Sequence, residues 1–109
     1  MTEKTVDWLV QEIKDLLDVS SVGLYEFMNF LNTSDDAMPI EQRRSVARHA
    51  LERVIAEEGV GLYWLQWPDF DRRGGLSLAD LPADAFSEPD EHGRYIAVDR
   101  PEVGHRAAK

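Results

Sequence analysis

The chain has 109 residues, no cysteine, and a formal net charge of -9 from 12 basic and 21 acidic residues. Its length suits one domain with its own core, and the absence of cysteine excludes a disulfide framework and a thiolate metal site. The acidic balance disfavours binding to phosphate backbones and anionic lipid, and no apolar stretch reaches bilayer length. We therefore expect a soluble, cytoplasmic protein with one domain over residues 1–100 and a flexible C-terminal tail over residues 101–109.

Three segments carry apolar residues at the spacing of one helical face. The first helix is predicted over residues 5–18 and the second over residues 21–31, although residues 22–27 also allow an extended start. The third covers residues 39–58 and opens on a proline, which suits a first helical turn. Gly59 is expected to end this helix in a left-handed conformation.

Two strands follow the helices. Residues 60–67 are apolar on both alternating sets and stop at a proline, and residues 94–98 form a second short apolar run. Residues 69–93 between them are broken by glycines and prolines and are predicted to form a long irregular loop. The predicted fold is α+β, with three helices packed under a two-stranded antiparallel ribbon.

The order helix, helix, helix, strand, loop, strand over residues 5–98 resembles the winged-helix class. That resemblance implies that the third helix enters the DNA major groove, with Arg43, Arg44, Arg48 and Arg53 in the reading role. It also implies a hairpin wing, which is ordinarily basic or neutral in DNA-binding members. The loop of this chain is acidic instead, and many winged helices bind proteins.

The arginines of the third helix share that helix with glutamates. Arg48 and Arg53 each have a glutamate four positions later, close enough to form an ion pair on the helix surface. Only Arg43 and Arg44 lack such a partner. Two free arginines fall short of the roughly six to ten phosphate contacts that give strong nonspecific DNA affinity, so we do not expect nucleic acid as the partner.

No catalytic, cofactor or metal signature is present. Residues 69–80 imitate a calcium loop, but Arg73 stands where the fifth position needs an acid. His49, His92 and His105 are far apart and form no ligand pair. Neither a phosphate loop nor a nucleophile elbow appears. We expect no metal, no cofactor and no enzymatic activity.

Aromatic and acidic residues near the end of the first strand are the candidates for binding. Trp64 and Tyr63 are expected in the core, as strand aromatics usually are. An exposed aromatic pair with charged neighbours has the composition of an interface hot spot, and an acidic loop steers basic partners. The expected partner-binding residues are Trp67, Phe70, Asp69, Asp71, Asp84, Glu88 and Asp90. The same acidity also serves solubility, so composition alone leaves both roles open.

The sequence thus predicts a non-catalytic, acidic protein–protein interaction module that binds a basic partner. Its charge and size are analogous to those of inhibitors and immunity proteins that neutralise basic toxins such as nucleases. The alternative is a winged-helix transcriptional regulator that binds DNA through residues 39–58. A homodimer through Trp67, Phe70 and the ribbon edge is compatible with either function.

Overall fold

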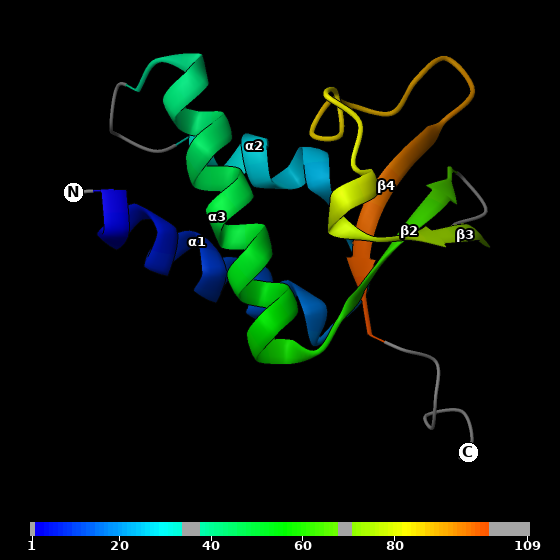
Figure 1. Ribbon diagram of the computed structural model, residues 1–109, viewed down its shortest axis with the longest axis horizontal. Helices are drawn as coiled ribbons and strands as arrows, with labels where there is room; N and C mark the ends of the chain where they lie inside the picture. The colour runs from blue at the N-terminus through cyan, green and yellow to red at the C-terminus, as the bar shows by residue number, and fades with distance from the viewer. Residues whose placement is uncertain (1, 34–37, 68–70, 101–109) are drawn as a thin grey trace.

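The computed structural model describes residues 2–33, 38–67 and 71–100. The elements in chain order are α1 (Thr2–Leu17), β1 (Val22–Gly23), α2 (Leu24–Asn32), α3 (Ile40–Glu58), β2 (Gly61–Gln66), β3 (Asp71–Leu76), the 3-10 helix η1 (Leu78–Asp80) and β4 (Arg94–Asp99). The predicted α+β class is confirmed, with three helices and one antiparallel sheet. Figure 1 shows the helices gathered on one side of that sheet.

The third helix ends where the sequence predicted. Gly59 has φ 67° and ψ 27°, and its N–H donates to the carbonyl oxygen of Ile55 at 3.0 Å. This left-handed conformation carries little steric cost only in glycine, because other residues bring a Cβ too close to the backbone. The terminus therefore turns the chain directly from α3 into β2.

The second helix begins at Leu24, three residues later than predicted, because residues 22 and 23 form β1. The extended start that the sequence also allowed is confirmed. The Glu26 side chain accepts a hydrogen bond from the Gly23 N–H at 2.9 Å, which satisfies one donor at the helix start. A Cβ at Gly23 would lie 2.5 Å from the Tyr25 ring, so glycine makes room for this turn.

The sheet has four strands in the order β1-β4-β2-β3, all pairs antiparallel. The predicted pairing of β2 with β4 is confirmed, with Gly61 opposite Asp99 and Gln66 opposite Arg94. The two-stranded ribbon is a wrong prediction, because β1 and β3 extend the sheet on either side. β2 is consequently an inner strand and offers no free edge.

β3 lies inside the stretch that was predicted to be an irregular loop. Its two glycines weaken a strand assignment from sequence, but here Gly74 and Gly75 pair with Trp64 and Tyr63 of β2. The register shifts between Trp64 and Leu65, as in a β-bulge, and glycine commonly marks such a site. The glycines therefore belong to an irregular strand rather than to a turn.

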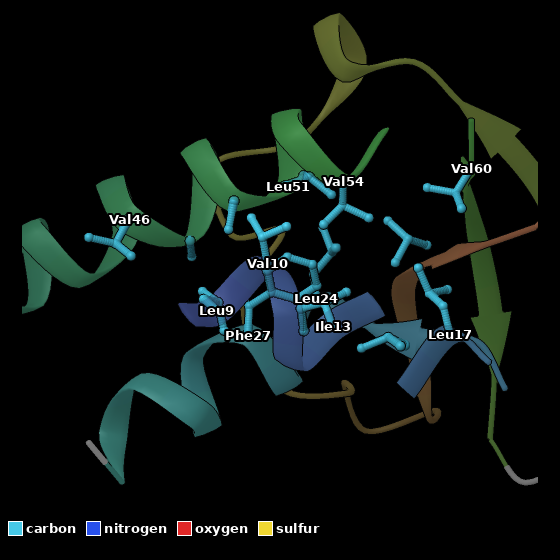
Figure 2. Packing of buried hydrophobic residues seen from close by; sticks show 14 of the residues in the cluster. Leu9, Val10, Ile13, Leu17, Leu24, Phe27, Val46, Leu51, Val54 and Val60 are labelled. Carbon is cyan, nitrogen blue, oxygen red and sulfur yellow. The ribbon is translucent and has the colours of Figure 1, made fainter. Parts of the chain in front are cut away.

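The main core lies between the helices and the inner face of the sheet. Figure 2 shows the side chains of Val10 and Ile13 on α1 and Leu51 and Val54 on α3 directed into this layer. The largest fully buried side chains of this core are Phe27, Leu9, Ile13, Leu24, Leu31, Leu51, Ile96, Val22, Val46, Val54 and Val98. Each contributes roughly 1.5–3 kcal/mol by leaving water.

The opposite face of the sheet carries a smaller cluster. Leu65, Tyr95 and Ala97 are buried there, with Tyr25 and Tyr63 packed against them. The Tyr25 and Tyr95 rings meet edge to face at 5.4 Å between centroids and 88° between planes, a favoured aromatic geometry. Tyr63 is thus half-buried in this second cluster rather than in the main core.

Candidate partner-binding site

Residues 81–88, which we call the acidic segment, follow η1 and are anchored to the main core. Ala85 is buried, and Phe86 meets the fully buried Phe27 at 6.0 Å between ring centroids. The Ala85 N–H donates to the Pro82 carbonyl at 3.1 Å. This packing fixes the segment against the helices, although most of its side chains face solvent.

A groove of about 630 Å³ lies between α2, α3 and the acidic segment. Its apolar part includes Met28 and Phe86, which are half-buried, and Ile40, which is 43% exposed. The α3 wall is formed by residues four positions apart, which share one helical face. Residues lining the groove include Tyr25, Met28, Asn29, Ile40, Arg44, Arg48, Leu81, Asp84, Phe86 and Glu88. Its walls therefore carry opposite charges above an apolar floor.

Of the four arginines assigned by the winged-helix resemblance, Arg53 pairs with Glu57 at 3.1 Å, as predicted. The other three differ in their contacts. Arg43 donates from Nε to the Met38 carbonyl at 3.1 Å and from Nη1 to the Asn32 side-chain oxygen, which ties together the ends of α2 and α3. Arg48 pairs with Glu52 at 3.1 Å, as predicted. Arg44 makes no hydrogen bond or ion pair within the described residues. Arg44 is thus the one cation of these three that remains available.

A second and smaller hollow of about 80 Å³ lies on the other side of the acidic segment. Asp84 and Glu88 line both the groove and this hollow, and neither carboxylate makes a hydrogen bond or ion pair with a described residue. Trp64 of β2 lines the hollow together with Asp90 and Arg94. The structure thus places three of the predicted acidic residues at the same hollow as Trp64.

Trp64 was expected in the core, and that prediction is wrong because its side chain is 36% exposed. Its neighbours explain the exposure. On β4 it lies opposite Ile96, but on β3 it lies opposite Gly74, which contributes no side chain to cover it. The sequence signal for this exposure is the pair Gly74–Gly75, which cannot cover a tryptophan on the neighbouring strand. Using that signal requires knowing that these glycines form β3 beside β2.

Asp90 has a structural role in the turn before β4. Its carboxylate accepts hydrogen bonds from the N–H of His92 at 2.8 Å and of Arg94 at 3.0 Å, and from Arg94 Nε at 3.1 Å. The Arg94 backbone hydrogen bond is the main cause that lowers the pKa of Asp90 below its ordinary value. Of the three acids at the hollow, Asp90 is therefore ionised and already paired with Arg94.

The remaining predicted residues lie at the end of β2. Trp67 is 59% exposed, and its N–H donates to the Gly93 carbonyl at 2.8 Å. It lines neither the groove nor the hollow. Asp71 begins β3, but its side chain is not described, and Asp69 and Phe70 lie outside the described residues. The acidic residues therefore meet Trp64, whereas the sequence grouped them with Trp67.

The described residues carry neither a metal-binding cluster nor a membrane-spanning helix. Among residues 2–33, 38–67 and 71–100, no group of three histidine, aspartate or glutamate side chains is placed to hold a metal ion. The stretch that imitates a calcium loop instead places Gly74 in β3. Within the same ranges, every helix is too short or too polar to cross a bilayer.

Comparison with known proteins identifies no relative. A scan against protein-family models finds no family that matches the chain, and searches of curated proteins and of solved structures find no match either.

Proposed function

We propose that this chain is a non-catalytic interaction module that binds a basic protein through the acidic segment. The observation that carries this proposal is the position of Asp84 and Glu88 between the groove and the hollow, with no partner among the described residues. A net charge of -9 attracts a basic protein over long range. Unpaired carboxylates at the contact surface would then favour the matching orientation.

The surroundings of these carboxylates have the anatomy of an interface. Met28 and Phe86 provide apolar area inside the groove, and Trp64 provides an accessible indole beside it. Interfaces typically combine such an apolar or aromatic centre with a charged rim. Trp67 lies next to the turn before β4 through its hydrogen bond to Gly93, so it extends the proposed surface.

Charge and size support a more specific proposal, an inhibitor or immunity-type protein that neutralises a basic toxin. The absence of cysteine suits a reducing cytoplasm, where such a protein would act. Asp69, Phe70 and Asp71 remain proposed contacts at the strand end. A homodimer that uses a sheet edge would have to use β1 or β3, because β2 is an inner strand.

The alternative is a winged-helix regulator that binds DNA through α3. The order of α1, α2, α3 and the antiparallel β2 and β4 favours it. Three features of the site weigh against it, since Arg43 and Arg48 are engaged within the fold and the acidic segment borders the same groove as Arg44. Phosphate would meet Asp84 and Glu88 there.

The proposal is tested by capture and charge reversal. The full chain is immobilised and exposed to native host lysate at low salt, with and without nuclease, and retained proteins are identified by mass spectrometry. Binding of the purified partner is then measured for the double variant Asp84→Lys with Glu88→Lys. We expect affinity to fall at least about tenfold, because reversed charges oppose a basic surface.

A matched control reverses two exposed acids at opposite ends of α1, Glu3→Lys and Asp15→Lys. It changes the net charge equally, and its effects on the helix dipole oppose each other. Equal weakening in both double variants would refute a local site. Retention of nucleic acid alone, lost with Arg44→Ala, would refute the proposed function and favour the DNA-binding alternative.

A further inference from the structure

The indole of Trp64 is accessible from the side of β3. Its partner on that strand is Gly74, and a Cβ built at Gly74 would meet no atom within 4 Å. On the other side the buried Ile96 supports the ring position. Trp64 is thus left uncovered on the β3 side, and on the β4 side it lines the hollow together with Arg94 and Ile96.

The hollow beside this indole suits a side-chain head group. A volume of about 80 Å³ holds several water molecules, whereas a pocket for a whole small molecule typically takes about 300–1,000 Å³. The planar guanidinium of an arginine, carried on an extended side chain, is small enough to enter. The size therefore favours one residue of a protein partner over a free cofactor.

The charges around the hollow select a cation. Arg94 is already held by Asp90 through its backbone N–H, Nε and Nη2, the last at 3.1 Å. Asp84 and Glu88 have no such partner in the described part of the chain. Two uncompensated carboxylates next to an accessible indole combine ion pairing with cation–π attraction.

We propose that the hollow formed by Trp64, Asp84 and Glu88 receives the guanidinium group of a partner's arginine. The guanidinium stacks on the indole and donates its N–H groups to the two carboxylates. Arginine fits better than lysine because its planar fork both stacks and donates in two directions. This inference rests on the proposed function and names the chemistry by which the basic partner is recognised.

The test uses the full chain and two blocked peptides, tetra-arginine and tetralysine. The indole N–H signals of Trp8, Trp64 and Trp67 are assigned by NMR and followed during titration at low salt. We expect a saturable shift of the Trp64 signal with tetra-arginine and weaker binding of tetralysine. Trp64→Leu should weaken tetra-arginine binding about three- to fivefold, the value expected when an exposed cation–π contact is lost.

Three variants distinguish the stacking from general charge. Trp64→Tyr keeps an aromatic face and should retain most of the affinity. Trp8→Leu, on α1 and 39% exposed, should have no effect. Asp84→Asn with Glu88→Gln should abolish the arginine preference. An unchanged amide spectrum outside the hollow establishes that each variant is folded. A shift confined to Trp67, or equal binding of tetralysine, would overturn the inference.

The natural partner separates this inference from the proposed function. If Asp84→Lys with Glu88→Lys releases the partner but Trp64→Leu does not, the acidic segment binds a basic protein without an arginine in the hollow. The further inference is then wrong and the proposed function stands. If neither variant affects the partner, both are wrong.

Discussion

The Asp90 carboxylate accepts hydrogen bonds from both the backbone N–H and the guanidinium of Arg94, at 3.0 and 3.1 Å. These bonds close the turn that positions the start of β4 and one wall of the hollow. They favour the ionised form, so the pKa of Asp90 lies below its ordinary value of 3.8. A group of this kind stabilises the fold above its ordinary pKa and loses that contribution as the pH falls through its folded pKa.

We therefore predict that Asp90→Asn is less stable than the parent at neutral pH and that the difference shrinks as the pH falls below 3.8. Urea unfolding across this range measures it. Glu91→Gln is the control, because Glu91 lies in the same turn and its carboxylate lies 3.3 Å from the His92 imidazole instead of binding the start of β4. A difference that is constant with pH, or equal in the control, would contradict the assigned role of Asp90.

Two glycines with positive φ should differ in their tolerance of alanine. Gly59 has φ 67° with open space around its Cβ position, so Gly59→Ala should cost about 1–2 kcal/mol from backbone strain alone. Gly93 has φ 77°, and a Cβ there would lie 2.6 Å from the Trp67 carbonyl oxygen. Gly93→Ala should therefore destabilise the fold more than Gly59→Ala.

The matched control for both is Gly75→Ala, where a Cβ would make an ordinary contact of 3.5 Å with the Leu62 carbonyl. Because Gly75 has no positive φ, we expect a change below about 1 kcal/mol. Urea unfolding of the three variants ranks them. If Gly93→Ala lowered the free energy of unfolding no more than Gly75→Ala, the Trp67 carbonyl would not lie as close to Gly93 as described.

The aromatic contact between Phe27 and Phe86 should couple the acidic segment to the core. Their rings lie 6.0 Å apart at 72°. A double-mutant cycle with Phe27→Leu and Phe86→Leu should give a coupling of about 0.5–1.5 kcal/mol. The more exposed pair of Trp8 and Phe30, at 6.1 Å, is the comparison and should give less. No coupling at Phe27 would mean that the segment is not anchored there.

Tyr95 should titrate well above an ordinary tyrosine. Its burial, with smaller effects from Tyr25 and Glu26, raises the pKa of Tyr95 from 10.0 to about 12. The fold thus holds the neutral phenol, and this stabilisation is complete below pH 10 and is lost as the pH rises toward 12. Phenolate absorbance should show a late ionisation step that Tyr95→Phe removes, together with the matching loss of stability in urea.

Local signals predicted much of this fold. The apolar stripes located α1 and α3, and Gly59 predicted the end of α3, because helix periodicity and terminal glycines act within a few residues. For β1 the sequence offered an extended start only as an alternative to helix. Its two residues are a strand because Val22 pairs with Val98, 76 positions away. β3 was obscured by its glycines, whose strand conformation depends on pairing with β2.

The candidate site was also predicted only in part, because local patterns identify single residues but not how distant segments pack together. Charge composition selected Asp84 and Glu88 as partner contacts, and helix spacing left Arg44 unpaired. Their convergence on one groove depends on how the acidic segment packs on α2 and α3, which no local pattern reports. Trp64 was assigned to the core because strand aromatics usually are, and only its pairing with Gly74 reveals why it is accessible.

The strand order β1-β4-β2-β3 has a consequence for how the chain folds. β2 and β3 can pair as soon as both have been made, but β4 follows both in the chain and lies between β1 and β2. β1 therefore has no strand partner until residues 94–99 have been made and pair with it. Pairing between strands so far apart in the sequence slows folding. Until β4 has been made, the nascent chain also exposes the edges of β1 and β2 that β4 covers in the folded protein.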